Sequence, residues 1–233
     1  MVPRDPVSVF RRFEYLKDLT DNAFADLARY CVWQSVPSGK QIILANESTA
    51  DVYFVAAGKV RVLLYSAADG REVLFTKVGT YEMFGEVAAI DGHRRSATVE
   101  AEGDCVVAIL KQEKFRQLVQ DHSSFAFAVM GKLAADVRRL SERVYEFSTL
   151  NVESRVHAEL LRCAVPDKKQ KGQAVISPVL RAEFAARIST NREAVSRVIT
   201  RLEDEGIAVR KGQDIHILNL ERLRNLVISA KGE

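Results

Sequence analysis

The density of turn signals between residues 35 and 111 constrains the fold of this chain more than any other feature. Short segments rich in Val, Phe and Tyr alternate there with turn-forming residues. The segments include VYFVAAGKVRVLLYS, REVLFTKV and CVVAILK, and the turn positions are Gly39, Asn46, Gly58, Asp69-Gly70, Gly79, Asp91-Gly92 and Gly103-Asp104. This spacing predicts an all-β sandwich or barrel, in which Asp69-Gly70 is the clearest hairpin turn. A short helix from Asp21 to Cys31 is expected before it.

A long helix with a narrow apolar stripe is predicted from Ser123 to Leu150. Its apolar residues recur with gaps of 3, 4, 3, 4 and 3, which is the a/d pattern of a heptad. The stripe consists of Met130, Leu133, Val137, Leu140, Val144 and Phe147. So narrow a stripe favours pairing with a second helix, and we predict a homodimer interface. Packing of the same stripe on the β domain of its own chain is the alternative.

Composition excludes several classes of protein. A chain of 233 residues with 47% hydrophobic content has room for one large domain or two ordinary ones. No stretch approaches the ~20 uninterrupted apolar residues of a membrane helix, and the opening MVPRDPVSVFRRFE does not resemble a signal peptide, so we expect a cytoplasmic protein that does not engage membranes. The cysteines, Cys31, Cys105 and Cys163, have no CxxC spacing, so no metal site, iron-sulfur cluster or disulfide framework is expected.

The C-terminal third carries the pattern of a DNA-binding module. Residues 151–233 contain 15 Lys and Arg against 11 Asp and Glu, a weak basic excess. A helix at Ser154–Ala164 is followed by LRAEFAARI and NREAVSRVITRLEDEG, which are separated by the turn IST, and then by VRKGQDIHIL, a ribbon turning at Lys211-Gly212. Helix, short turn, helix and hairpin are typical of a winged helix-turn-helix, whose second helix enters the major groove.

The second of these helices offers side chains that can read DNA bases. It opens with Thr190, Asn191, Arg192 and Glu193, and Arg197 lies about one turn further on. Arginine can donate two hydrogen bonds to guanine, and a carboxylate can accept one from cytosine. Two alternatives remain open: Thr190 and Glu193 also fit a capping box, and Arg197 also fits a solvated face.

The stretch FGEVAAIDGHRRSAT, residues 84–98, predicts an anion site within the β domain. Gly85 would let the backbone approach a ligand closely. Arg95 presents a planar fork to a phosphate, and the amides near Ser96 and Ala97 add neutral donors. Glu86 repels phosphate but can accept a sugar hydroxyl. A ribose joined to a phosphate would satisfy both groups, and an ordinary surface loop is the alternative.

The order of β domain, long helix and winged helix resembles the CRP/FNR superfamily of bacterial transcription regulators over essentially the whole chain. The resemblance implies an α+β fold: an N-terminal β-roll (double-stranded β-helix or jelly-roll) over residues 1–122, a dimerisation helix over 123–150 and a winged helix-turn-helix over 151–233. FGEVAAIDGHRRSAT is similar to the family's phosphate-binding cassette. Its roles would place the ribose 2′-hydroxyl on Gly85 and Glu86 and the cyclic phosphate on Arg95 and Ser96, flanked by Phe84, Val87 and Ala97.

The resemblance leaves the base of the nucleotide undecided. Ser141 stands where a polar residue touches the purine across the dimer in cyclic-AMP-responsive members. Leu140, however, replaces a threonine that reads adenine, and Asp136 replaces an arginine that supports the site. Cyclic AMP, cyclic GMP or both therefore remain open as the effector. No metal is implied, and His93, the only candidate haem ligand near the cassette, is more consistent with a solvated residue.

The segment NREAVSRV is similar to the recognition helix of the catabolite-activator branch, R-E-T-V-x-R. Arg192, Glu193 and Arg197 coincide with its base-reading positions, and Arg181 coincides with a contact from the preceding helix. The resemblance implies a palindromic DNA site with TGTGA-like half-sites and RNA polymerase as a partner.

The prediction is thus a non-enzymatic, cyclic-nucleotide-responsive transcription regulator. No HExxH, GxSxG or P-loop motif points to an enzyme. One alternative is a family member with a vestigial or different effector site that binds DNA constitutively. The other is a cyclic-nucleotide-binding subunit that acts on a protein partner.

Overall fold

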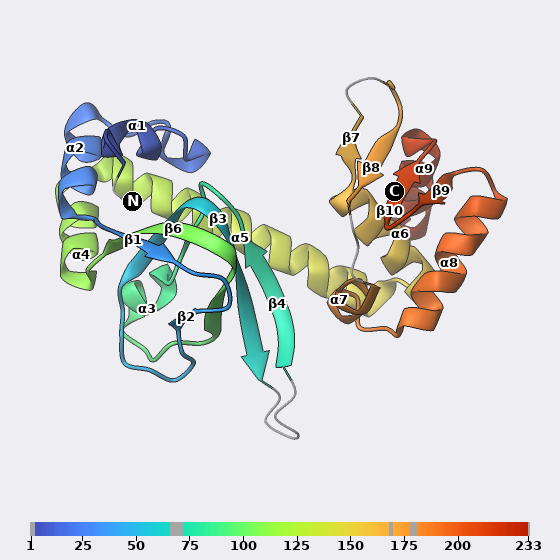
Figure 1. The fold of residues 1–233 in the computed structure, drawn as a ribbon, viewed down its shortest axis with the longest axis horizontal. Helices are drawn as coiled ribbons and strands as arrows, with labels where there is room; N and C mark the ends of the chain where they lie inside the picture. Colours follow the sequence, from blue (N-terminus) through green and yellow to red (C-terminus); the bar gives the residue numbers. More distant parts are fainter. Residues whose placement is uncertain (1–2, 66–71, 168–169, 178–180, 233) are drawn as a thin grey trace. The chain divides into compact units, whose positions relative to one another are not determined.

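The computed structural model describes residues 3–65, 72–167, 170–177 and 181–232. It contains two compact units, residues 1–137 and 138–233, and the boundary falls inside one long helix. The predicted α+β class, with an N-terminal β-roll and a C-terminal helix-turn-helix, is confirmed (Figure 1). The division into segments at residues 122 and 150 stays a prediction. Within the described residues no helix has the length and apolar character needed to cross a membrane.

The β-roll of the first unit is built on two long antiparallel strands, β3 (Val52–Tyr65) and β6 (Thr98–Leu110). Register shifts between Val55 and Lys59 interrupt their pairing, as bulges do where a sheet must bend. The order β1-β6-β3-β4 is completed by β2, which pairs with β6, and β5, which pairs with β3. The remaining strands are β1 (Val32–Val36), β2 (Gln41–Ile43), β4 (Glu72–Val78) and β5 (Met83–Phe84).

The predicted turns behave in different ways. Asn46 adopts a left-handed φ of 67°, which asparagine tolerates. The expected Asp69-Gly70 hairpin lies outside the described residues, although β3 and β4 pair antiparallel on either side of it. The short helix α3 (Glu86–Asp91) follows β5 directly, so the predicted anion stretch is a strand end, a helix and a loop.

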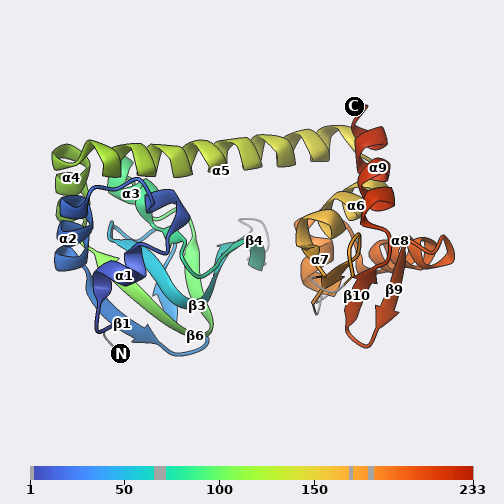
Figure 2. The same cartoon turned by 90° about the horizontal axis from the view of Figure 1, so that it is seen from above.

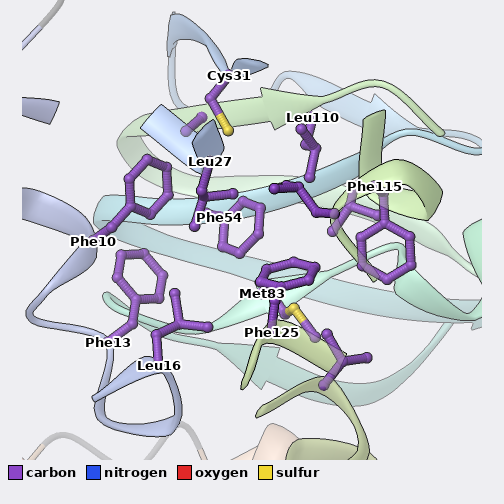
Figure 3. Packing of buried hydrophobic residues seen from close by; sticks show 14 of the residues in the cluster. Phe10, Phe13, Leu16, Leu27, Cys31, Phe54, Met83, Leu110, Phe115 and Phe125 are labelled. Carbon is purple, nitrogen blue, oxygen red and sulfur yellow. The ribbon is translucent and has the colours of Figure 1, made fainter. Parts of the chain in front are cut away.

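An aromatic core lies between the β-roll and the helices of the first unit (Figure 3). Phe10 and Phe13 meet the Phe54 ring edge-on, with centroids 5.4 and 5.8 Å apart. The predicted helix at Asp21–Cys31 is present as α2 (Asp21–Tyr30), capped by Thr20. Around this core lie α1 (Pro6–Phe10), the 3-10 helix η1 (Glu14–Leu16), α4 (Gln112–Asp121) and the start of α5 (Ser123–Thr149).

The second unit is a helix-turn-helix with a small antiparallel sheet (Figure 2). The predicted ribbon is present as a hairpin of β9 (Ala208–Lys211) and β10 (Asp214–Ile217). The helices pack on the sheet through one apolar cluster that includes Val195, Ile199 and Ile215. The other elements are α6 (Val152–Cys163), β7 (Val165–Pro166), β8 (Ala174–Ile176), α7 (Arg181–Arg187), α8 (Arg192–Asp204) and α9 (Leu220–Lys231).

Candidate functional site

Gly85 stands where β5 turns into α3 and has a left-handed φ of 84°. A Cβ built there would lie 2.8 Å from the Asp51 carbonyl oxygen and 2.9 Å from Nη1 of Arg95. Any side chain would therefore collide with the chain's own groups. That Gly85 lets a ligand approach closely stays a prediction; the close approach seen here is to Arg95 and to the Asp51 carbonyl.

Arg95 is buried, with 3% of its surface exposed, and its guanidinium points into the first unit. Nε donates to Thr49 Oγ1 at 3.1 Å, Nη1 to the Gly85 carbonyl at 2.9 Å, and Nη2 to the Asp51 carbonyl at 2.7 Å. Burial lowers the pKa of Arg95 from its ordinary value, against the effect of Tyr53 and nearby carboxylates. Three of the five N–H groups are engaged by these residues, and no other described residue accepts from the second N–H of Nη1 or of Nη2.

Two stacked aromatic rings lie next to the Arg95 guanidinium. The rings of Tyr53 and Phe84 stack with centroids 4.9 Å apart and an interplanar angle of 6°. The Arg95 guanidinium carbon lies 6.0 Å from the Tyr53 ring centroid. Phe84 is buried, and its ring packs against the Tyr53 ring that lies near Arg95.

Glu86 occupies the first turn of α3 and is 5% exposed. Its carboxylate forms an ion pair and hydrogen bond, through Oε1, with Nζ of Lys132 on α5. The same Nζ lies 2.8 Å from Asp136 Oδ2, one turn along α5. Burial lowers the pKa of Lys132, but Glu86 and Asp136 outweigh it and raise that pKa above its ordinary value. We call these three residues the sugar cluster.

The remaining predicted cassette residues are less enclosed. Ser96 and Val87 are exposed and Ala97 is half-buried. Backbone bonds hold the loop in place: Asn46 N–H donates to the Arg95 carbonyl, and Arg95 N–H donates to the Glu47 carbonyl, both at 2.9 Å. The structure thus brings Gly85, Glu86 and Arg95 together. Leu140 and Ser141 lie on the exposed surface of α5, in the second unit.

The residues present are suited to a ribose phosphate. Arg95 supplies positive charge and unused N–H donors, while Glu86 retains a carboxylate oxygen that can accept a hydroxyl hydrogen. Lys132, Thr49 and Asp51 were not predicted as site residues. Their contacts to Glu86 and Arg95 cross at least 44 residues of sequence, and no local pattern marks them.

The predicted base-reading residues lie at the start of α8. Arg192, Glu193 and Arg197 are exposed. The helix is capped by Asn191, whose side chain accepts from Ala194 N–H at 2.8 Å, and not by Thr190. The capping-box alternative for Thr190 and Glu193 is therefore wrong, because Thr190 lies one residue outside the cap and donates its backbone N–H to the Ala185 carbonyl.

Among the other basic residues of this unit, some are exposed and others form ion pairs with glutamates. Lys211, at the tip of the β9–β10 hairpin, is exposed. Arg201 bonds both carboxylate oxygens of Glu153 at 2.6 Å, and Arg210 pairs with Glu203 at 2.8 Å. The Arg181 side chain lies outside the described part of the chain, so its predicted DNA contact stays a prediction.

The predicted helix stripe on α5 is largely exposed. Val137 and Val144 are 62% and 64% exposed, and Met130, Leu140 and Phe147 are also exposed. Leu133 differs, because it packs against the aromatic core of the first unit. Phe127, three residues before Met130, is 72% exposed and lies beside the stripe, one position outside its alternating gaps of 3 and 4.

A second ionic cluster, absent from the sequence prediction, lies in the second unit. Its two carboxylates, Glu146 on α5 and Glu159 on α6, are 4% and 2% exposed. Glu159 pairs with Arg143 at 2.7 Å, with Arg187 at 3.4 Å and with Arg162. Glu146 accepts two bonds from Arg162 at 2.9 Å and lies 3.5 Å from Lys231 of α9. We call these six residues the carboxylate hub.

The hub also reaches the helix-turn-helix. Nη2 of Arg143 donates to the Arg187 carbonyl at 2.6 Å, which is the last carbonyl of α7. Burial raises the pKa of Glu159, but Arg143 and Arg162 outweigh it and hold that pKa below its ordinary value. The last turns of α5 are therefore bonded to α6, α7 and α9.

Two family models match the chain. Residues 33–122 match the cyclic nucleotide-binding domain, and residues 154–226 match the Crp-like helix-turn-helix domain. The first match contains Gly85, Glu86 and Arg95, and the second contains α7, α8 and the hairpin.

Relatives and solved structures agree with these models. The cAMP-activated global transcriptional regulator CRP of Pasteurella multocida (strain Pm70) is 28% identical over 188 residues, which is 80% of this chain and 90% of that protein. FixK2 from Bradyrhizobium japonicum matches with a TM-score of 0.69 and 23% identity, over 84% of this chain and 96% of that one. The regulator CLP of Xanthomonas campestris, described as c-di-GMP responsive, matches with a TM-score of 0.69 and 18% identity, over 85% and 99%.

Proposed function

Because the chain belongs to the CRP/FNR superfamily of transcription regulators, we propose that it is a homodimer whose DNA binding is controlled by a cyclic nucleotide in the β-roll. Cyclic AMP or cyclic GMP binds at Gly85, Glu86, Arg95 and Ser96. The relatives are transcription regulators and not enzymes. The proposal places the protein in the cytoplasm with its DNA and makes RNA polymerase a partner.

One observation carries this proposal: Gly85 stands between a buried arginine and a buried carboxylate. Arg95 lies within 2.9 Å of the Gly85 carbonyl, and Glu86 is the next residue along the chain. A cyclic phosphate is recognised by the first group and a ribose hydroxyl by the second. A glycine is required between them because a Cβ would collide with Arg95.

In the proposed mechanism the ligand competes with contacts made inside the first unit. Phosphate takes the free N–H groups of Arg95 and draws the guanidinium from the Gly85 and Asp51 carbonyls. The protein is in equilibrium between an arrangement that binds DNA and one that does not. The ligand shifts this equilibrium only by the difference between its binding free energies for the two arrangements, which is about 1–3 kcal/mol for ordinary allosteric coupling. The exposed α5 stripe, including Val137 and Val144, is the proposed dimer contact.

For DNA, Arg192, Glu193 and Arg197 are the proposed base-reading residues of α8. Their exposure at the N-terminal end of that helix supports the role, since recognition helices read bases with this end. Arg181 and Lys211 are proposed as additional contacts. The proposed target is a two-fold site with TGTGA-like half-sites.

Isothermal titration of the full-length protein with cyclic AMP and with cyclic GMP tests the effector site. We expect micromolar binding of at least one of them, and Arg95→Ala should weaken it by at least tenfold, because a charged hydrogen bond contributes about 1.5–3 kcal/mol. Arg94→Ala is the matched control: Arg94 is exposed and bonds only the Asn46 carbonyl among the described residues, so affinity should hold. Binding unaffected by Arg95→Ala would contradict the assignment.

A different effector is the second candidate. The β-roll and helix-turn-helix fold is shared with a regulator described as c-di-GMP responsive, so the fold alone does not choose the ligand. Leu140 and Asp136 also depart from the cyclic-AMP-responsive pattern. Absence of heat with both mononucleotides would favour a vestigial or different site, with DNA bound constitutively.

A further inference from the structure

We propose that Lys132 on α5 is a positioning residue that sets the selectivity of the effector site for a ribose over a 2′-deoxyribose. The proposal rests on the proposed function, because it assigns the sugar of the nucleotide to Glu86. Lys132 acts by holding the Glu86 carboxylate where the 2′-hydroxyl can donate to it.

The burial of the sugar cluster is the first argument. The side chains of Glu86 and Lys132 are 7% and 19% exposed. A buried carboxylate that lacks a partner is costly, so it becomes protonated or turns toward water. Lys132 is the residue that prevents both outcomes, since no other described side chain forms an ion pair with Glu86.

The geometry of the carboxylate is the second argument. Lys132 bonds Oε1 of Glu86, and among the described residues none donates to Oε2. An ionised carboxylate offers acceptor positions on both oxygens. Holding one oxygen therefore orients the other as an acceptor for a ligand hydroxyl, and the ammonium itself need not touch the ligand.

The positions of charge along α5 are the third argument. By resemblance, a supporting arginine belongs at position 136, where this chain has Asp136. Lys132 lies four residues earlier, which is one turn along the same helix face. The carboxylate of Asp136 lies 2.8 Å from the Lys132 ammonium, and Lys132 is the cation that this face of α5 presents to Glu86.

Titration calorimetry with a nucleotide pair tests this assignment. The ligands are cyclic AMP and 2′-deoxy cyclic AMP, or the corresponding cyclic GMP pair if the wild type binds that nucleotide. The proteins are the full-length wild type, Lys132→Met, Lys132→Arg and Lys77→Met. Lys77 pairs with Glu102 at 2.5 Å on strand β4, so its variant removes a comparable ion pair outside the cassette.

We expect the wild type to prefer the ribose form by about 10- to 100-fold, as for a hydrogen bond to a charged acceptor. In Lys132→Met this ratio should fall to within about threefold of one, while the affinity for the 2′-deoxy nucleotide stays unchanged. Lys132→Arg should restore most of the ratio, and Lys77→Met should keep it in full. A purely structural role for Lys132 would weaken both nucleotides alike and leave the ratio as it is.

Two failures can be told apart. If Lys132→Met binds both nucleotides with the wild-type ratio, or with a larger one, the assignment to Lys132 is overturned and the proposed function stands. If the wild type binds neither member of either pair, the proposed function falls, and this proposal falls with it.

Discussion

Helix α5 carries two ionic clusters that differ in the balance of their charges. In the sugar cluster one ammonium, that of Lys132, stands between the carboxylates of Glu86 and Asp136. In the carboxylate hub, two carboxylates meet three arginines and a lysine. The unit boundary between Val137 and Arg138 falls between the two clusters.

This difference in charge balance suits the sugar cluster to binding a ligand and the carboxylate hub to stabilising the fold of the second unit. The hub surrounds each buried carboxylate with several donors, so its acceptor positions are occupied and α5, α6, α7 and α9 are held together. In the sugar cluster no described residue donates to Oε2 of Glu86, so a ligand hydroxyl can donate to that oxygen. Substitutions in the hub should therefore cost stability. In the sugar cluster, substitution of Asp136, whose side chain is 31% exposed, should cost much less.

Removal of the Glu159 charge should have the largest effect. Glu159→Gln leaves Arg143, Arg162 and Arg187 with one buried carboxylate fewer, and we expect the second unit to lose about 3–5 kcal/mol of unfolding free energy. Amide hydrogen exchange of α6 measures this loss. Glu153→Gln on the same helix is the control; it breaks a pair whose partner Arg201 is 60% exposed, so about 1 kcal/mol or less is expected. Equal losses in the two variants would contradict the role of the hub.

Acid should weaken the second unit before the first. Burial lowers the pKa of His157 below its ordinary value of 6.5, so on acidification the unfolded chain takes up a proton before the folded unit does. Stability is therefore complete above about pH 6.5 and falls as the pH drops through the folded value. Glu159, whose pKa lies below its ordinary 4.5, adds a further loss at lower pH.

Two probes follow the units separately between pH 8 and 5. Hydrogen exchange of α6 reports the second unit, and the fluorescence of Trp33, the only tryptophan of the sequence, reports unfolding of the first. The α6 amides should lose protection across this range, and His157→Gln should flatten that slope. A slope in α6 that survives in the variant would assign the acid sensitivity to another group.

Asp136→Asn should have the smallest effect on stability. The Lys132–Asp136 pair is an i,i+4 contact at the edge of the cluster, and such pairs contribute about 0.2–0.5 kcal/mol. Glu86 keeps Lys132 in this variant, so chemical unfolding followed by Trp33 fluorescence should shift by less than about 0.5 kcal/mol. A loss above about 2 kcal/mol would mean that the sugar cluster is as structural as the hub.

The sequence predicted the helices and strands, and it predicted the grouping of those site residues that are near one another in the sequence. The strands bounded by turn residues, the helix from Ser123 and the order of helix, turn, helix and hairpin were visible because they are local patterns. The juxtaposition of Gly85, Glu86 and Arg95 follows from one 15-residue stretch and from the family it resembles. The capping-box alternative at α8 was wrong because Thr190 and Asn191 are both good capping residues, and only the structure shows that Asn191 is the cap.

Contacts between distant segments were outside the reach of the sequence. Lys132 meets Glu86 across 46 residues, and Arg143 meets Glu159 across 16, with the turn between α5 and α6 intervening. A charged residue on a helix reads as solvated unless its tertiary partner is known. For the same reason the bonds of Arg95 to Thr49 and to the Asp51 carbonyl were not predicted from the sequence.

A mobility shift on a palindromic DNA duplex with TGTGA half-sites tests the central claim most directly. The full-length protein is titrated without nucleotide, with cyclic AMP and with cyclic GMP, at one fixed salt concentration, because DNA affinity depends on salt. We predict that at least one nucleotide tightens binding by about 5- to 150-fold, the range of ordinary allosteric coupling. Equal DNA affinity in the presence and absence of both nucleotides would contradict the account.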